Sequence, residues 1–434
     1  MSAGVFPTAT EREDVVSPMN GDPAPLLLVE SDPACAEKLL RLLSSLDADR
    51  QFAPKCVDTA GKAIEEIAST RYALVVLDDK LPGADGMAVL GHIRSLPTSR
   101  QPAVIMLTGV GNESAAVEAM KRGAKDYLPK DGLDAPSLMR AIRSALERRN
   151  LEQQVARYTE QLRERNAQVE ADLNMAREMQ EAFLPARYPT FPRNVPPKES
   201  ALHFCHRYLP TGAVGGDFFD ILPISDSQAG VFICDVMGHG VRAALVTAMV
   251  RALAEELVPM AAEPGKFLAE VNHHLLGILT QTRMPMFASA FYLVVDLAVG
   301  ELRYSSAGHP SPLLVRRNLG TVEALRPPGS RPGPALGVFE ESIYPICRCP
   351  VAPQDLVVLF TDGLYEVEGA EGDEYGQERL LAAVNKRAGL PASELFDELL
   401  ADVQKHAGNR GFADDVCIVG VEVARTGLAE GGSP

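Results

Sequence analysis

Residues 137–184 contain neither proline nor glycine and carry many charged side chains. Such a stretch predicts one long helix, because helix-breaking residues are absent over its whole length. It separates two parts of the chain whose hydrophobic patterns differ. The 434 residues are enough for about three units of ordinary size, so the sequence predicts a multidomain protein with a helical linker.

Five positions within this stretch, all apolar except Arg165, follow alternating spacings of three and four residues, as in a two-stranded coiled coil. The positions are Val155, Tyr158, Leu162, Arg165 and Val169. We therefore expect residues 144–185 to form a coiled-coil linker and to join two copies of the chain as a homodimer. The alternative is a single helix that packs on one of the chain's own domains.

Short apolar runs alternate with amphipathic stretches in residues 26–143. The apolar runs are 26–29, 72–77, 103–107 and 126–128, and the helical patterns include 35–46, 60–68 and 115–122. This alternation predicts an α/β domain with a parallel sheet and helices on both faces. In such sheets the functional groups collect at the carboxyl ends of the strands.

Each of the four apolar runs is followed by residues with reactive or charged side chains. Glu30 and Asp32 follow the first run, Asp78 ends the second, Thr108 ends the third and Lys130 follows the last. A carboxylate, a hydroxyl and an ammonium group at one sheet edge suit phosphorylation of the carboxylate. A divalent cation would neutralise charge, the lysine would hold the phosphoryl group, and the threonine would bond to it.

The order and spacing of these residues resemble the receiver domain of two-component response regulators. The matching elements are D-x-x-x-P-G-x-D-G from Asp78, T-G from Thr108 and D-Y-x-x-K ending at Lys130. The resemblance implies a flavodoxin-like fold, Asp78 as phosphoacceptor, a bound Mg²⁺ and a sensor histidine kinase as partner. Ser31 stands where receivers usually carry a second acidic ligand, so we expect weaker magnesium binding unless Asp32 or Asp79 compensates.

The pattern changes after residue 199 to strands in succession, then helices, then strands again. Expected strands are 204–209, 217–222, 231–236, 290–297, 301–305, 313–316, 356–360 and 416–423, and expected helices are 243–257, 265–280, 377–388 and 392–407. Strands and helices in separate blocks predict an α+β sandwich. Residues 325–337 hold four prolines and three glycines and predict an irregular surface loop.

Four acidic motifs recur in this second part, each beside an apolar run. They are Gly-Gly-Asp-Phe-Phe-Asp at 215–220, Asp-Val-Met-Gly-His-Gly at 235–240, Thr-Asp-Gly-Leu at 361–364 and Ala-Asp-Asp-Val at 413–416. Carboxylates without histidine or thiolate partners favour Mg²⁺ or Mn²⁺. Two such ions hold and activate a water for phosphoryl displacement.

The order of the motifs resembles the metal-dependent serine/threonine protein phosphatase (PPM) family in its SpoIIE/RsbU-like branch. Residues 173–185, 307–310 and 374–376 add to the resemblance. It implies that Asp217, Asp235, Asp362 and Asp414 are catalytic metal ligands, with the Val236 carbonyl as a further ligand. Four more residues match motif positions and shape turns or support the ligands: Asp220, Asp415, His239 and His309. The Gly-Gly-Asp-Phe segment also resembles a diguanylate cyclase signature, but no other cyclase element is present.

The two resemblances together predict a response regulator whose output is dephosphorylation of phosphoserine or phosphothreonine on a protein. The branch implies that this substrate is an anti-sigma-factor antagonist. The alternative is a non-catalytic adaptor of the RssB type, which binds a sigma factor or its regulator under receiver control. The presence of all four acidic positions favours the enzyme.

Composition excludes several other classes of function. The chain has 42 basic and 58 acidic residues and a net charge of −16, which disfavours nucleic acid and anionic membranes as partners. It has no apolar run of membrane-spanning length and no signal-peptide pattern, so we expect a cytoplasmic protein. We expect flexible tails at 1–25 and 425–434 and a phosphatase domain at 186–424.

Overall fold

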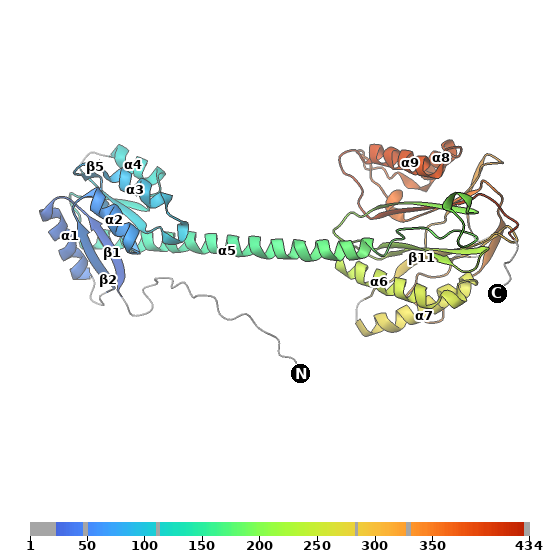
Figure 1. Ribbon diagram of the computed structural model, residues 1–434. Helices are drawn as coiled ribbons and strands as arrows, with labels where there is room; N and C mark the ends of the chain where they lie inside the picture. Colours follow the sequence, from blue (N-terminus) through green and yellow to red (C-terminus); the bar gives the residue numbers. More distant parts are fainter. Residues whose placement is uncertain (1–22, 47–50, 110–112, 283–284, 327–330, 429–434) are drawn as a thin grey trace. The chain divides into compact units, whose positions relative to one another are not determined.

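The computed structural model describes residues 23–46, 51–109, 113–282, 285–326 and 331–428. The chain divides into two compact units, Met1–Ala167 and Gln168–Pro434 (Figure 1). Most of the two predicted tails lies outside the described residues. Among the described helices, none is both long and apolar enough to cross a membrane.

The first unit is built on a five-stranded parallel sheet in the order β2-β1-β3-β6-β7. Its strands are β1 (Ala24–Val29), β2 (Phe52–Val57), β3 (Leu74–Asp78), β6 (Ala103–Thr108) and β7 (Asp126–Pro129); a small ribbon pairs β4 (Lys80–Leu81) with β5 (Ala84–Asp85). Buried apolar residues cover both faces of the sheet. The predicted α/β fold with a parallel sheet is confirmed.

Helices pack against the two faces through separate apolar clusters. One face carries α1 (Pro33–Leu46) and the first turns of α5 (Ala135–Glu181); the other carries α2 (Ala60–Ser69), α3 (Gly86–Ser95) and α4 (Glu113–Lys121), with the 3₁₀ turn η2 at Thr98–Arg100. Strand β2 was not predicted, because this edge strand is mostly exposed and lacks an apolar run. Helix α3 was also missed, although the Asp85 side chain caps it by accepting the Met87 N–H.

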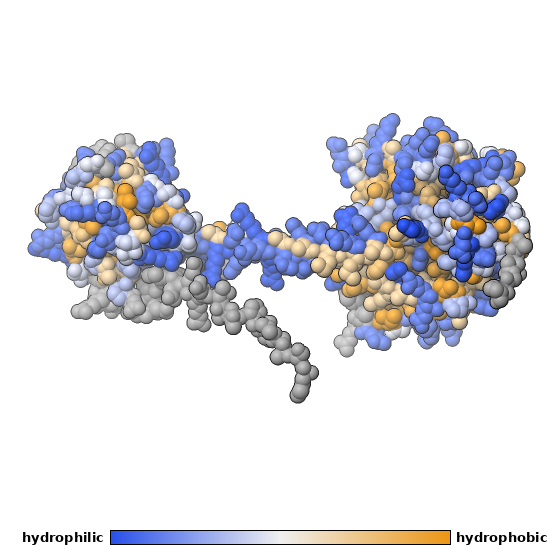
Figure 2. Space-filling model, viewed as in Figure 1, coloured by the Kyte–Doolittle hydropathy of each residue, from blue (hydrophilic) through white to orange (hydrophobic). Residues whose placement is uncertain are grey.

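Helix α5 is continuous over 47 residues, close to the predicted stretch. Its first turns bury Leu138 and Ile142 against the receiver-like sheet, and the Arg149 guanidinium donates to the Gln101 carbonyl at 2.9 Å. Beyond these turns the helix is mostly hydrophilic (Figure 2). The predicted seam positions are exposed in the single chain, Leu162 by 61%, and pairing with a second copy stays a prediction.

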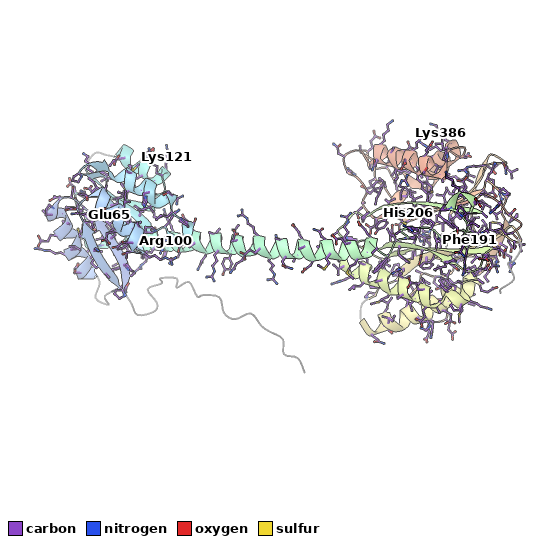
Figure 3. All side chains as sticks on the ribbon, viewed as in Figure 1. Glu65, Arg100, Lys121, Phe191, His206 and Lys386 are labelled. Atoms are coloured by element: carbon purple, nitrogen blue, oxygen red, sulfur yellow. The ribbon has the colours of Figure 1, made fainter. Side chains whose placement is uncertain are left out.

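The second unit is a sandwich of two five-stranded antiparallel sheets with a pair of helices on each outer face (Figure 1). The first sheet has the order β15-β12-β11-β10-β9 and is covered by α6 and α7, whereas the second has the order β14-β13-β16-β17-β8 and is covered by α8 and α9. The core between the sheets contains Phe191 and Phe219, and His206 packs on the Phe219 ring. Phe191 and His206 are labelled in Figure 3. The predicted α+β sandwich is confirmed.

The elements of this unit agree closely with the predicted ranges. The strands are β8 (Leu202–Leu209), β9 (Asp217–Pro223), β10 (Gln228–Val236), β11 (Ala288–Asp296), β12 (Glu301–Ala307), β13 (Leu313–Arg316), β14 (Thr321–Ala324), β15 (Cys347–Pro350), β16 (Leu356–Phe360) and β17 (Val416–Val423). The helices are α6 (Val241–Glu256), α7 (Pro264–Thr282), α8 (Gly376–Lys386) and α9 (Ala392–Ala407), with 3₁₀ turns η3 (Pro197–Glu199), η4 (Val258–Met260) and η5 (Asp362–Leu364).

Two features of the unit differ from the sequence expectations. Strands β14 and β15 were not predicted, because each has only four residues and is largely solvent-accessible. The segment 325–337 was expected on the surface, and this is wrong for Leu325 and Leu336, which are both buried. Leu336 is fully buried beside α7 and pairs with Ala288, since its side chain completes the apolar cluster under that helix.

Candidate functional site

The first unit brings three of the predicted receiver residues together at the carboxyl ends of its strands. Asp78 ends β3, Glu30 follows β1 and Lys130 follows β7. The Lys130 ammonium lies 2.8 Å from Asp78 Oδ1 and 2.8 Å from Glu30 Oε2. One cation therefore serves two buried carboxylates at the position expected for the phosphoacceptor.

Burial and the shared Lys130 ammonium shift the pKa values of Asp78, Glu30 and Lys130. Burial raises the pKa of Asp78, and the neighbouring Glu30 charge adds to that effect against the Lys130 bond. For Glu30, burial is outweighed by bonds from Lys130 and the Asp32 N–H, so its pKa is lowered. The two carboxylates in turn raise the pKa of Lys130 despite its burial. Lys130 is thus held charged beside Asp78.

The other predicted receiver residues take different places. The Asp32 carboxylate accepts the Ala34 N–H at 3.0 Å and so caps the start of α1. Ser31 directs its hydroxyl toward the Lys80 carbonyl at 3.5 Å. Thr108 is buried at the end of β6, and its carbonyl accepts the Lys130 N–H at 2.9 Å. That bond fixes the backbone of Lys130 beside the strand that carries Thr108.

The second unit places the four acidic motifs at neighbouring strand ends. Asp217 begins β9 and lies directly opposite Asp235 near the end of β10. The two carboxyl groups are close enough that each acts on the pKa of the other. Asp362 follows β16, and Asp414 lies two residues before β17. We refer to these four residues as the four-carboxylate site.

Negative charge accumulates at this site. Burial raises the pKa of Asp217 strongly, and Asp235 is the next largest cause. Burial, followed by the charges of Asp362 and Asp414, raises the pKa of Asp235 to about 7. Burial and Asp414 also raise the pKa of Asp362. The charges that act most strongly on these groups come from other carboxylates, an arrangement that is costly unless a cation neutralises it.

The side chains do not form a finished metal cage in the described part of the chain. No group of three or more His, Cys, Asp or Glu side chains there is arranged to hold a metal ion. The donor chemistry nevertheless fits a hard divalent cation, because the site offers carboxylate oxygens that repel one another. The Val236 carbonyl borders the same loop, since a Cβ atom on Gly216 would lie 2.7 Å from it. Only glycine permits that approach.

Two hydrogen-bonded residues support the site, and one of them was missed from the sequence. The Thr361 hydroxyl donates to Asp217 Oδ2 at 2.7 Å and accepts the Cys417 N–H at 2.9 Å. The Asp415 carboxylate accepts the N–H groups of Gly216 and Thr211, each at 2.7 Å. Asp415 therefore shapes the loop before Asp217, as its motif position suggested. The role of Thr361 could not be read from its motif.

Helix α5 supplies a third support, which the sequence analysis also missed. The Gln180 side-chain amide donates to the Gly215 carbonyl at 2.7 Å, and Gly215 N–H donates to Gln180 Oε1 at 2.9 Å. Gln180 is buried near the end of the helix. A single glutamine in a charged helix gives no signal for such a contact.

The other three residues at motif positions, Asp220, His239 and His309, lie in different environments. Asp220 accepts the N–H of the following Ile221, and burial raises its pKa. His239 is exposed in the turn before α6. His309 is buried at the end of β12. None of the three was predicted as a metal ligand.

Comparison with known families now identifies both units. Residues 26–143 match the family model of the response regulator receiver domain, and residues 225–424 match that of stage II sporulation protein E (SpoIIE). The chain joins a receiver domain to a SpoIIE-family domain. Asp235, Asp362 and Asp414 lie within the second match, and Asp217 lies eight residues before it begins.

Individual relatives match only part of this chain. Phosphoserine phosphatase RsbP of Bacillus subtilis is 25% identical over 217 residues, which cover 50% of this chain and 51% of RsbP. Response regulator protein FleR of Pseudomonas aeruginosa is 40% identical over 109 residues, 25% of this chain and 21% of FleR. The chain thus spans between about a fifth and just over half of the length of the curated relatives that it matches.

A solved structure supports the fold of the SpoIIE domain. The SiaA-PP2C domain of Pseudomonas aeruginosa superposes with a TM-score of 0.50 at 24% identity. The match covers 59% of this chain and 98% of that domain. At this identity the likeness establishes a shared PP2C fold.

Proposed function

We propose that this chain is a response regulator whose output is metal-dependent dephosphorylation of phosphoserine or phosphothreonine on a protein. The observation that carries the proposal is the pairing of Asp217 with Asp235 at the strand ends next to Asp362 and Asp414. A site built from mutually repelling carboxylates suits cation binding better than it suits an apolar or anionic ligand. The same retained carboxylates argue against a purely adaptor role.

In this proposal Asp217, Asp235, Asp362 and Asp414 hold Mg²⁺ or Mn²⁺, with the Val236 carbonyl as a further ligand. The bound ions supply an activated water and neutralise the charge of the phosphoryl group. Thr361 orients the Asp217 carboxylate through its hydroxyl. Asp415 holds the backbone before Asp217 in place through the Gly216 N–H.

The printed names of two relatives support the substrate class that we propose. RsbP and RsbU of Bacillus subtilis both carry the name phosphoserine phosphatase. We propose a phosphoserine- or phosphothreonine-bearing protein for this chain, of the anti-sigma-factor antagonist class that the SpoIIE/RsbU-like resemblance implies.

The receiver supplies the control. We propose Asp78 as the phosphoacceptor of a sensor histidine kinase, with Lys130 positioned to hold the phosphoryl group and Thr108 to bond to it. Mg²⁺ at this site would bind near Glu30 and Asp78, with Asp32 capping α1. Helix α5 connects the two domains and, through its exposed seam, joins two copies of the chain.

The test is phosphate release by the purified full chain from a phosphoserine protein, a phosphothreonine peptide and a phosphotyrosine peptide, with Mn²⁺, Mg²⁺ or EDTA. We expect metal-dependent release from the first two substrates alone. Asp362→Asn should abolish turnover and keep the circular dichroism spectrum, since it removes a charged ligand and little volume. The matched control is Asp397→Asn, which alters an exposed pair with Arg207. Equal turnover by both variants would contradict the metal assignment.

A further inference from the structure

His309 occupies an unusual position for a histidine. It follows β12 in a turn where Gly308 adopts a φ of +73°, and its side chain is buried, with the residue 6% exposed. Burial lowers the pKa of His309 to about 3, so the imidazole is neutral under any ordinary condition. A neutral imidazole has one N–H donor and one acceptor nitrogen.

The two ring nitrogens face two different sheets. Nδ1 lies 2.7 Å from the Ser289 hydroxyl on β11. The Phe360 carbonyl at the end of β16 lies close enough to the imidazole to act on its pKa. Nε2 is buried and has no hydrogen-bond partner among the described residues. In a neutral imidazole that accepts the Ser289 hydroxyl proton at Nδ1, the ring proton is on Nε2 and is available to the Phe360 carbonyl.

Both contacts adjoin the four-carboxylate site. Ser289 is the register partner of Asp235 across the β10–β11 pair. Phe360 lies two residues before Asp362, and Thr361 between them bonds to Asp217. The imidazole therefore spans the two sheets at the ends that carry Asp235 and Asp362.

We propose that His309 is a positioning residue that ties β11 to β16 and so holds Asp235 and Asp362 at the separation that a shared divalent cation requires. The inference rests on the proposed function and goes beyond it, because His309 touches neither metal nor substrate in this scheme. Groups that orient metal ligands commonly change metal affinity by about 10-fold to 100-fold when they are removed.

The alternative is that His309 only fills space, and four variants separate the two roles. His309→Leu keeps an apolar side chain of similar volume and removes both polar contacts. Ser289→Ala removes one hydroxyl only. His309→Gln places an amide N–H where Nε2 directs its proton, and is the rescue variant. His206→Leu is the matched control, because His206 is another histidine of the same domain, half-buried and hydrogen-bonded to Tyr188.

The measurement is the dissociation constant for Mn²⁺ of the full chain by isothermal titration calorimetry, beside the melting temperature and metal-dependent phosphate release. We expect His309→Leu and Ser289→Ala to weaken Mn²⁺ binding by about tenfold or more. His309→Gln should recover most of that loss. His206→Leu should lower the melting temperature and leave Mn²⁺ binding within about twofold, as expected for packing alone.

Mn²⁺ binding by His309→Leu and Ser289→Ala within twofold of the wild-type value would overturn the inference. If His309→Leu does not fold, Ser289→Ala and His309→Gln still decide the question. Failure of the proposed function looks different, since the wild-type chain itself would then neither bind Mn²⁺ nor release phosphate.

Discussion

Gln180 and Gly215 exchange two hydrogen bonds, one in each direction, at 2.7 and 2.9 Å. Gly215 begins the Gly-Gly-Asp segment that carries Asp217, and Gln180 lies in the last turns of α5. The first turns of the same helix are buried on the receiver sheet. A single helix thus contacts the receiver core at one end and the backbone of the four-carboxylate site at the other.

This contact predicts that Gln180→Met impairs catalysis. Methionine keeps the length of the side chain but leaves the buried N–H and carbonyl of Gly215 without partners, at a cost of about 1–3 kcal/mol. We expect metal-dependent phosphate release to fall by about tenfold if that cost acts on the active arrangement. The control is Gln161→Met, an exposed glutamine of the same helix. Equal rates of phosphate release for the two variants would show that the hydrogen bonds between Gln180 and Gly215 do not affect catalysis.

Ser31→Asp should strengthen magnesium binding at the receiver. The Ser31 hydroxyl is a neutral ligand, whereas an aspartate would add a charged oxygen beside Asp78 and Glu30. We expect labelling of the wild-type chain by acetyl phosphate to need more Mg²⁺ than labelling of Ser31→Asp, measured as the half-saturating concentration. Asp78→Asn should take up no label in either background. Labelling of Asp78→Asn at the wild-type rate would place the phosphoacceptor elsewhere.

The fold, and the position of the candidate site residues at strand ends, could be predicted from the sequence for one physical reason. Asp78, Asp217 and Asp235 sit at the ends of apolar runs, and strand ends converge in both kinds of sheet. The supporting contacts were not predictable, because Gln180 and Thr361 act through bonds to residues 35 and 144 positions away. Strand β2 was missed for the opposite reason, since an exposed edge strand needs no apolar pattern.

The raised pKa of Asp235 predicts a pH-dependent stability in the absence of metal. Burial and the neighbouring carboxylates raise the pKa of Asp235 from its ordinary value of 3.8 to about 7. The folded state then binds more protons than the unfolded state between these values, so the fold loses stability as the pH rises through this interval. In EDTA, Asp235→Asn should be more stable than the wild type. This difference in stability should be larger at about pH 8 than at about pH 5.

The melting temperatures of the two proteins at each pH give this comparison. Asp397→Asn serves as the control, because Arg207 lowers the pKa of Asp397 and the carboxyl stays ionised across the interval. Its effect should not change with pH. A constant difference between Asp235→Asn and wild type would mean that Asp235 titrates normally.

The exposed seam of α5 predicts a dimer. Val155, Tyr158 and Leu162 are each more than 60% exposed, and such a row of apolar side chains on a helix favours pairing. Light scattering should give twice the 46.7 kDa chain mass for wild type. Leu162→Lys should shift the mass toward one chain, whereas Glu164→Lys, away from the seam, should not. A wild-type chain that stays monomeric at all concentrations would rule out dimerisation through the α5 seam.

The central claim is that the state of Asp78 controls chemistry at the four-carboxylate site. The most direct measurement is the Mn²⁺-dependent rate of phosphate release from a phosphoserine protein by the full chain, before and after treatment with acetyl phosphate. We expect the rate to change by about fivefold or more in wild type, in the range of ordinary allosteric coupling, and to stay constant in Asp78→Asn. A wild-type rate that does not change although Asp78 is fully labelled would contradict the account.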